Sequence, residues 1–327
     1  MQKKIALLHR HPKDRIKETN AAFSYLASKG VDVLTYKTFD RLNGFQKCVK
    51  DLMWIFYAPL LVVFRGYDVI YCDDSFPIYP ALVKLVSPKS KVVLRIGDLH
   101  LMYYFSGWVY ELLHWFEKIA WRMADEIIAI SEPMAEFICY ESKRDVGFVL
   151  DPVDPKYFQC EGAKVEKLVM FHGYLTANKR VDLLIRAAMQ LPDVDFVVIG
   201  DGPDKKRLMS IAPKNVFFKG WVPFKSIPRH IAACSIGVAL RSDNPGNDYV
   251  VTSPFLQYGI MGKPCLVTKR KVFGDYLWQF STVDQMVKMI KYLLNHPEEG
   301  EKLKEYVLEN HAAEKIAGEI WEILLSL

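Results

Sequence analysis

The stretch LVMFHGYLTANKRVDLLIRAAMQLPDVDFVVIGDGP, residues 168–203, decides the fold class of this chain. It opens with a short apolar run before a glycine, which predicts a buried strand over 168–171. Apolar residues then recur at the spacing of one helix face from Val181 to Met189. A second buried strand is expected over 194–199 and ends in Gly-Asp-Gly-Pro. The pattern therefore predicts one βαβ unit of a parallel sheet.

Two loops of this unit lead from a strand to a helix, and both must open at the same edge of the sheet. They cover residues 173–180 and 200–203. Open α/β sheets bind their ligands at that edge. The first loop places Lys179 beside backbone N–H groups at a helix start, a combination that suits a diphosphate. The alternative is an ordinary solvated lysine at the start of a helix in an unrelated α/β domain.

The composition indicates a globular protein. The chain has 327 residues, of which 51% are hydrophobic and 25% are charged, enough for two domains with their own cores. The net charge of +5 is spread over both halves, whereas proteins that bind nucleic acid concentrate their basic residues. Anionic ligands or an anionic membrane surface fit better. No apolar stretch has the length of a spanning helix, and the N-terminal run Ile5 to Leu8 is too short for the apolar region of a signal peptide.

The six cysteines do not indicate a disulfide framework or a zinc site. They lie far apart, form no C-x-x-C pair and mostly fall within apolar runs. Cysteines in such positions usually behave as small buried hydrophobic residues. We therefore expect a protein of a reducing compartment, the cytoplasm, without a metal site.

The quoted stretch resembles the C-terminal half of GT-B fold glycosyltransferases of the family 4, or group 1, type. Members of that family carry the pattern G-R-L-x-x-x-K-G-x-D-x-L-I, followed by V-G-D-G-P. The matching positions are Gly173, Leu175, Lys179, Asp182, Leu184 and Ile185, followed by IGDGP at 199–203. Further along the chain, 216–223 resembles the family's x-V-x-F-x-G-x-V-P turn, and 151–158 resembles its N-G-V-D-x-x-x-F segment.

The resemblance implies an α/β fold with two Rossmann-like, doubly wound parallel-sheet domains facing a cleft. We expect an acceptor-side domain over 1–160, a nucleotide-sugar-binding domain over 161–305, and a C-terminal helix over 306–327 that crosses back to the first domain. The implied activity is transfer of a sugar, with retained configuration, from a nucleotide diphosphate sugar to an acceptor hydroxyl of a glycan or a lipid-linked molecule. In this family the reaction needs no metal and no cofactor other than the donor substrate.

In family terms, the donor lies on the C-terminal domain. The expected donor-binding residues are Gly173, Tyr174, Lys179, Gly200, Gly202, Trp221, Val222, Ser253 and Gln257. The turn that contains Trp221 and Val222 is expected to hold the nucleotide base. Lys179 is also expected to be catalytic, because it stabilises the leaving diphosphate together with backbone N–H groups.

The chain departs from the family at its best-known motif, E-x7-E, whose second glutamate holds the donor ribose. Relatives carry S-P-x-K-x-x-E-Y-M-x-x-G-K-P, whereas 253–264 reads SPFLQYGIMGKP. Gln257 therefore replaces the second glutamate, and Tyr249 stands at the position of the first. The amide oxygen of Gln257 can still accept a hydrogen bond from a ribose hydroxyl, although more weakly than a carboxylate. Tyr174 stands where relatives place an arginine, so Lys263 or Arg241 is a candidate to assist Lys179.

Two alternatives remain open at this point. The loss of both glutamates favours a non-catalytic relative that binds a glycan or a partner glycosyltransferase. A nucleotide-sugar epimerase has the same two-domain architecture, but it needs paired acid and base carboxylates, and Gln257 counts against it.

In the N-terminal half, the resemblance places the acceptor side at the ends of predicted strands. The strand over 4–8 leads into a basic loop with His9 and Arg10, which is either a cationic rim for an anionic acceptor or a solvated loop. The strand over 92–96 leads to Asp98, which matches the family's His-Asp or Arg-Asp and is expected to be catalytic. Arg95 and His100 flank Asp98 and could replace the family's missing cation. His100 taken alone is more often an ordinary core or surface histidine.

Two further features of this half carry expectations. The strand over 68–72 ends in Asp73 and Asp74, which we interpret as residues of the cleft rim rather than metal ligands. A helix over 109–123 is expected to bury the apolar face made of Val109, Leu112, Leu113, Phe116, Ala120 and Met123. Aromatic residues crowd this helix and its approach, as they do the segment 54–57. Most are expected in the core, but those off the apolar face could form a belt at the inner face of a membrane, near a lipid-linked acceptor.

Overall fold

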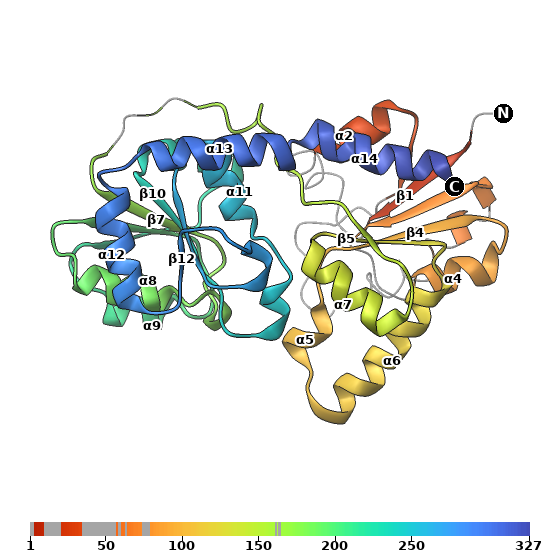
Figure 1. Ribbon diagram of the computed structural model, residues 1–327, viewed down its shortest axis with the longest axis horizontal. Helices are drawn as coiled ribbons and strands as arrows, with labels where there is room; N and C mark the ends of the chain where they lie inside the picture. The colour runs from red at the N-terminus through yellow and green to blue at the C-terminus, as the bar shows by residue number, and fades with distance from the viewer. Residues whose placement is uncertain are drawn as a thin grey trace. The chain divides into compact units, whose positions relative to one another are not determined.

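The computed structural model describes residues 3–9, 21–34, 57, 60–62, 64–73, 79–160, 162 and 165–327. The chain forms two compact units, of which unit 1 is Met1–Pro152 with Ala313–Leu327 and unit 2 is Val153–Ala312. Each unit contains a six-stranded sheet whose paired strands are all parallel. Figure 1 shows helices packed against each sheet. The chain therefore has the predicted α/β fold with two parallel-sheet domains.

Unit 1 is built on the strand order β2-β1-β3-β4-β5-β6. Its strands are β1 (Ile5–His9), β2 (Asp32–Leu34), β3 (Val69–Asp73), β4 (Lys91–Ile96), β5 (Glu126–Ala129) and β6 (Gly147–Phe148). Its helices are α2 (Ala21–Ser28), α4 (Tyr79–Val86), α5 (His100–Tyr104), α6 (Gly107–Met123), α7 (Glu132–Ser142) and α14 (Ala313–Ser326). Strands β1 and β3 are buried along their whole length, which explains their continuous apolar runs.

The expected buried face of α6 is only partly correct, because Ala120 is buried and Val109, Leu113 and Met123 are partly buried. Its buried residues are His114, Glu117, Ala120 and Trp121, whereas Leu112 and Phe116 are 47% and 57% exposed. The physical reason is a hydrogen-bonded polar group that holds the opposite face of the helix inward, and it is described below.

Unit 2 contains the quoted stretch, and its strand order is β12-β11-β10-β7-β8-β9. The strands are β7 (Leu168–His172), β8 (Asp195–Ile199), β9 (Val216–Gly220), β10 (Ile236–Ala239), β11 (Cys265–Thr268) and β12 (Gln279–Phe280). The helices are α8 (Val181–Met189), α9 (Lys205–Ile211), α10 (Ile227–Ala233), α11 (Ser253–Ile260), α12 (Val283–Leu293) and α13 (Glu298–His311). The predicted βαβ unit is confirmed as β7-α8-β8, with Val169 opposite Phe196.

Helices cover both faces of the unit 2 sheet, because successive residues of β7 enter two different cores. Val169 and Phe171 pack with the apolar face of α8 and with α12, whereas Met170 packs with α10, α11 and α13. This arrangement is the doubly wound one that the alternating strand and helix pattern predicts.

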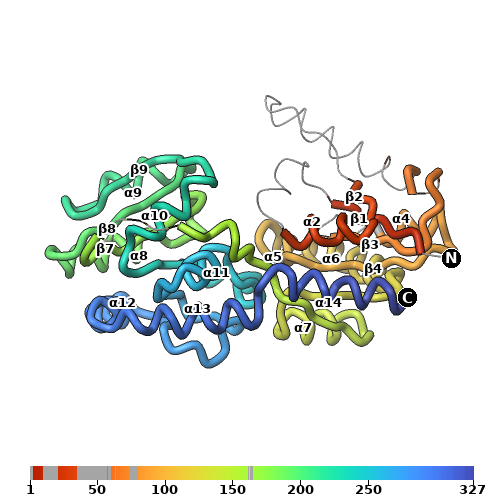
Figure 2. Tube along the Cα trace, turned by 90° about the horizontal axis from the view of Figure 1, so that it is seen from above, coloured from red at the N-terminus to blue at the C-terminus, as the bar shows by residue number. Residues whose placement is uncertain are grey.

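The chain passes from unit 1 to unit 2 after Pro152 and returns after Ala312. Val153 pairs with Ala312, and its amide donates to the carbonyl of His311, so the segment after Pro152 already belongs to unit 2. The chain returns to unit 1 at Ala313, where α14 lies beside α2 (Figure 2). Among the described residues, no helix is both long and apolar enough to cross a bilayer.

Candidate functional site

Three loops meet at the carboxyl edge of the unit 2 sheet. The amide of Gly173 donates to Ile199 O at 3.0 Å, and that of Leu175 donates to Asp201 O at 2.9 Å. The amide of Gly200 donates to Gly220 O at 2.8 Å. Backbone hydrogen bonds therefore bring the loops after β7, β8 and β9 together, and with them the expected donor residues Gly173, Gly200 and Gly202.

Gly200 and Gly202 have a structural role that the motif alone does not reveal. Their φ angles are 141° and 156°, where side chains are rarely tolerated. A Cβ atom on Gly200 would lie 1.9 Å from Gly173 O, and one on Gly202 would lie 2.3 Å from Leu175 O. Only glycine lets the second loop cross the first at this distance.

The cations at the start of α8 differ in their surroundings. Lys179 ends a short 3-10 turn, Ala177–Lys179, and is partly buried. Arg180 has left-handed backbone angles and donates to both carboxylate oxygens of Asp182, at 3.1 and 3.2 Å. These hydrogen bonds raise the pKa of Arg180 above its ordinary value. Asp182 thus compensates the charge of Arg180, which makes this guanidinium a poorer candidate for an anionic ligand.

A polar network attaches the loop after β10 to this turn. The carbonyl of Asn178 accepts from the amide of Ser242 at 2.8 Å, and its side chain accepts from Ser242 Oγ. Asn247, which is only 1% exposed, donates to Asn178 Oδ1 at 2.9 Å. Sequence reasoning missed these residues, because an asparagine in a Pro-Gly-Asn turn looks like ordinary loop chemistry.

Arg241 and Arg270 follow β10 and β11 at the same edge. The amide of Arg241 donates to Thr268 Oγ1 at 3.0 Å, and the Arg270 guanidinium donates to Arg241 O at 3.2 Å. Arg270 also donates to Asp243 at 2.7 Å, which lowers the pKa of Asp243. The interpretation of Lys263 as an assisting cation is wrong, because it precedes β11 and donates to Ala232 O at 2.9 Å. Residues before and after a parallel strand lie at opposite edges of the sheet.

Gln257 is held by a histidine that sequence reasoning missed. Its Oε1 atom lies 2.7 Å from Nε2 of His172, the last residue of β7. His172 Nδ1 lies 2.8 Å from the hydroxyl of Tyr258, which donates to Met170 O at 2.8 Å. Burial lowers the pKa of His172 to about 4, so the ring is neutral near pH 7. The expected ribose acceptor is therefore already engaged, while Ser253 is exposed at the start of α11.

Two aromatic rings stand exposed at this edge. Tyr174 follows β7 and is 64% exposed, and Trp221 follows β9 and is 72% exposed. Val222 is partly buried and packs against the core that β7, α10 and α11 share, which anchors the turn that presents Trp221. An exposed indole on a fixed turn can stack on a nucleotide base.

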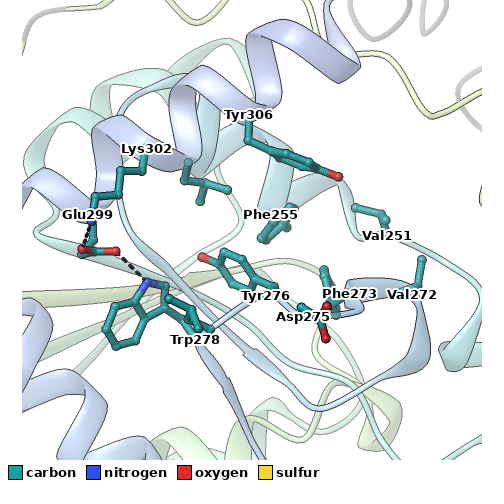
Figure 3. Close-up of a pocket in the computed structure, with 12 residues that line it drawn as sticks. Val251, Phe255, Val272, Phe273, Asp275, Tyr276, Trp278, Glu299, Lys302 and Tyr306 are labelled. Carbon is teal, nitrogen blue, oxygen red and sulfur yellow. Dashed lines mark hydrogen bonds and ion pairs between the residues drawn. The ribbon is translucent and has the colours of Figure 1, made fainter.

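A separate apolar cavity of about 420 Å³ lies in unit 2 between the segment 271–278 and α13. Figure 3 shows Phe255, Tyr276 and Trp278 lining it. Trp278 donates to Glu299 at 3.3 Å, and Lys302 donates to the same carboxylate at 2.6 Å. None of the expected donor residues lines this cavity.

In unit 1, the expected acceptor-side residues separate into a buried and an exposed group. Asp73 is 2% exposed, so its interpretation as a rim residue is wrong. It contacts His9 Nδ1 at 3.1 Å, the Arg95 guanidinium at 3.1 Å and the Tyr71 hydroxyl at 3.1 Å. Arg95 also donates to Asp151 at 2.7 Å.

Burial opposes the charge on Arg95, but the nearby Asp73, Tyr71 and Asp151 raise its pKa above the ordinary value. His9 and Arg95 are thus packed inside a charge network at the ends of β1, β3 and β4. In this position they support the edge of the sheet rather than line its surface.

Asp98 and His100 form the exposed group. Asp98 accepts from the amide of Leu99 at 2.9 Å, and its other oxygen lies 3.8 Å from His100 Nδ1. Their side chains are 31% and 40% exposed. Arg10 and Asp74 lie outside the described residues, as do Trp54 and Phe56.

Comparison with known proteins gives a match to one family model and to several solved structures of similar fold. Residues 166–296 match the family model of glycosyl transferases group 1, and no curated protein matches the chain. Anabaena HepE, solved with UDP and glucose, is 15% identical with a TM-score of 0.72, and the match covers 100% of both chains. The catalytic domain of starch synthase IV from Arabidopsis thaliana, bound to ADP and acarbose, is 13% identical with a TM-score of 0.72, over 100% of this chain and 99% of that one.

A putative UDP-N-acetylglucosamine 2-epimerase from Listeria monocytogenes is 10% identical with a TM-score of 0.62, over 98% of this chain and 95% of that one. At these identities the likeness shows a shared fold.

Proposed function

Because the region 166–296 belongs to the group 1 glycosyl transferases and the chain has the GT-B fold, we propose that this protein transfers a sugar from a nucleotide diphosphate sugar to an acceptor hydroxyl. One observation carries the proposal. Lys179, Trp221 and Gln257 come from three distant parts of the sequence, and all lie at the carboxyl edge of the unit 2 sheet. That edge is where open α/β sheets bind nucleotides.

Each part of a donor has a candidate partner at this edge. Trp221 offers a flat apolar surface to the base, and Lys179 with the backbone N–H groups of its loop offers positive potential to the diphosphate. Gln257 offers its amide to the ribose, held in place by His172. The solved neighbours that bind UDP or ADP support a nucleoside diphosphate as the leaving group.

For the reaction itself, we propose retention of configuration without a metal ion. Lys179 would stabilise the charge that develops on the leaving diphosphate, and Asp98 with His100 would contact the acceptor. The acceptor is proposed to be a glycan or a lipid-linked molecule. We also propose a cytoplasmic protein that contacts the inner face of a membrane peripherally through unit 1, supported by the exposed apolar side chains of that unit.

One observation favours a second candidate, a binding protein without catalysis. The Oε1 atom of Gln257 faces His172, and in that orientation it does not face a ligand. Incubation with a panel of nucleotide sugars, with and without candidate acceptors, separates the possibilities. Free nucleotide supports transfer, an epimeric sugar indicates an epimerase, and binding without either product supports the second candidate.

The substitution Lys179→Ala tests the donor site directly. Removing a charge-assisted contact should weaken UDP or ADP binding by roughly 10- to 100-fold while leaving nucleoside binding unchanged. Lys288→Ala is the matched control, because Lys288 is exposed on α12 and away from the edge. Isothermal titration of both variants provides the measurement. Unchanged UDP, GDP and ADP affinities in Lys179→Ala would contradict the proposed site.

A further inference from the structure

Helices α5 and α6 of unit 1 display a group of large apolar side chains to solvent. Tyr104 and Trp108 are each 77% exposed, Trp115 is 54% exposed and Phe116 is 57% exposed. We call the set Tyr104, Phe105, Trp108, Leu112, Trp115 and Phe116 the hairpin patch. Single exposed apolar residues are normal, but a contiguous group on one short segment marks an interaction site.

The hairpin patch follows one face of α6. Trp108, Leu112 and Trp115 are spaced by four and three residues, so they share one side of the helix. In an ordinary surface helix this apolar side would face the core. Here the side with Trp108, Leu112 and Trp115 faces solvent, although Ala120 and Trp121 further along α6 are buried, so the amphipathic pattern is inverted only in the part of α6 that carries the patch.

A polar group on the opposite side of α6 explains the inversion. His114, which is 4% exposed, lies 3.0 Å from Glu117 and 3.2 Å from Glu141 of α7. Lys118 donates to Glu141 at 3.1 Å. Although burial acts in the opposite direction, hydrogen bonds from Lys118 and His114 lower the pKa of Glu141. If α6 rotated to bury the hairpin patch, Lys118 and His114 would lose their contacts with Glu141. Losing a partner costs free energy when the group left behind is buried.

The end of the hairpin is uncharged. Residues 101–110 contain no Asp, Glu, Lys or Arg, and none of the residues of α5 is buried. Figure 1 shows the turn between α5 and α6 at the end of unit 1 farthest from its sheet, beyond α7. A projecting uncharged end can enter an apolar medium without desolvating an ion.

We infer that the hairpin patch docks on the headgroup region of an anionic bilayer. Tryptophan and tyrosine favour that region, because their rings are apolar with one polar atom. Arg122 is exposed on the same side of α6 as Trp115 and lies about 10 Å further along the helix. Its Nε donates to Ser142 O at 3.5 Å, and we infer that the rest of the guanidinium contacts lipid phosphate. Glu111 is exposed beside Trp108 and limits the insertion to a shallow depth.

A protein partner fits this surface less well. Protein interfaces place their apolar core at the centre of a patch and surround it with a polar rim. In the hairpin the uncharged residues 101–110 occupy the projecting end, and the charged residues Glu111, Lys118 and Arg122 all follow them along α6 instead of surrounding them. The inference specifies the peripheral contact proposed above, and it does not depend on the donor site.

Sedimentation with vesicles of phosphatidylcholine, with and without phosphatidylglycerol, tests the inference on the full chain. The double variant Trp108→Ser, Leu112→Ser should bind vesicles at least roughly tenfold more weakly than the parent, because both side chains leave the lipid. Leu85→Ser is the matched control, since Leu85 is 74% exposed on α4 and outside the patch. Glu111→Gln should bind more tightly, and Arg122→Gln should lose part of the preference for anionic lipid.

The outcomes separate the possible errors. If the parent protein binds no vesicles, both the peripheral membrane contact and the role of the hairpin patch in it are wrong. If the parent and the double variant bind equally, the protein contacts the membrane through a surface other than the hairpin patch. Self-association of the parent that the double variant abolishes, without vesicle binding, would show that a second copy covers the patch. Circular dichroism verifies folding, and nucleotide titration of the double variant reports on the donor site independently.

Discussion

His172 stands between two hydrogen-bond partners, Tyr258 and Gln257, and burial limits its protonation. Met170 O and Gln257 Oε1 only accept hydrogen bonds, whereas the Tyr258 hydroxyl and a neutral imidazole carry one hydrogen each. The three contacts Tyr258–Met170, His172–Tyr258 and His172–Gln257 therefore share two hydrogens. A doubly protonated ring would satisfy all three, but burial disfavours it. A glutamine at position 257 suits a neutral histidine, and a glutamate would favour a charged one.

Two substitutions of Gln257 test its part in donor binding. Gln257→Glu should raise the pKa of His172, which proton NMR of the imidazole measures, and should hold or tighten donor affinity. Gln257→Leu should weaken nucleotide-sugar binding by about fivefold or more, because the ribose loses a hydrogen-bond partner worth about 1 kcal/mol. A leucine variant that binds as the parent does would remove Gln257 from the donor site, whatever happens to His172.

The buried His172 should also make unit 2 sensitive to acid. Its pKa of about 4 in the folded chain lies below the ordinary 6.5. Between these two pH values the histidine is protonated in the unfolded chain but neutral in the folded chain. Stability is then complete above pH 6.5 and is lost as the pH falls toward 4, by at most about 3 kcal/mol. His172→Gln should flatten this dependence. Urea unfolding at several pH values measures it, and equal losses in both proteins would exclude His172 as the source.

At the scale of elements, the crossing of two loops determines the shape of the donor edge. The loop after β8 contacts the loop after β7 through Gly200 and Gly202, at distances that exclude a Cβ atom. The same crossing places Asp201 O against the amide of Leu175. A change in this crossing therefore moves the turn that carries Lys179.

Gly202→Ala tests the crossing. We expect a destabilisation of about 2 kcal/mol or more, because the added methyl group meets Leu175 O and φ is unfavourable for alanine. Gly318→Ala is the control, because a Cβ on this helical glycine of α14 meets nothing within 4 Å. There the substitution should be neutral or stabilise by about 0.5 to 1 kcal/mol. Denaturant unfolding compares the two, and similar free energies would mean that the loops can separate at little cost.

At the scale of the whole molecule, the last helix of the chain completes the core of its first unit. Ile316, Ile320 and Leu324 of α14 pack with Ile5 and Leu26 of unit 1. The sheet of unit 1 is thus covered on this face by helices from both ends of the sequence. The core of unit 1 consequently cannot be completed until α14 has been synthesised.

Neighbouring leucines of α14 provide a matched test of this packing. Leu324 is fully buried, whereas Leu325 is 40% exposed. Leu324→Ala should destabilise unit 1 by about 2 to 5 kcal/mol, and Leu325→Ala by less than about 1 kcal/mol. Hydrogen exchange followed by mass spectrometry should show faster exchange in β1 and α2 but not in β7 and β8. Faster exchange in both units would mean that they unfold together.

Local patterns in the sequence were enough to predict the elements that depend on neighbouring residues alone. The helical spacing from Val181 to Met189 and the apolar runs beside it sufficed to predict β7-α8-β8, because both patterns are set by residues close in the chain. The Gly-Asp-Gly-Pro and lysine pattern likewise indicated the edge of the sheet where Lys179 and Trp221 lie.

Which side chains are buried could not be predicted from local patterns and became known from the three-dimensional structure. The apolar face of α6 points outward because Glu141, on another helix, holds His114 inward. His172 engages Gln257 because the fold brings α11 to the end of β7, although the two are distant in sequence. Helix spacing reports that one face differs from the other, but the free energy of burial depends on the partners that each face meets. Those partners come from remote parts of the chain, and no local pattern identifies them.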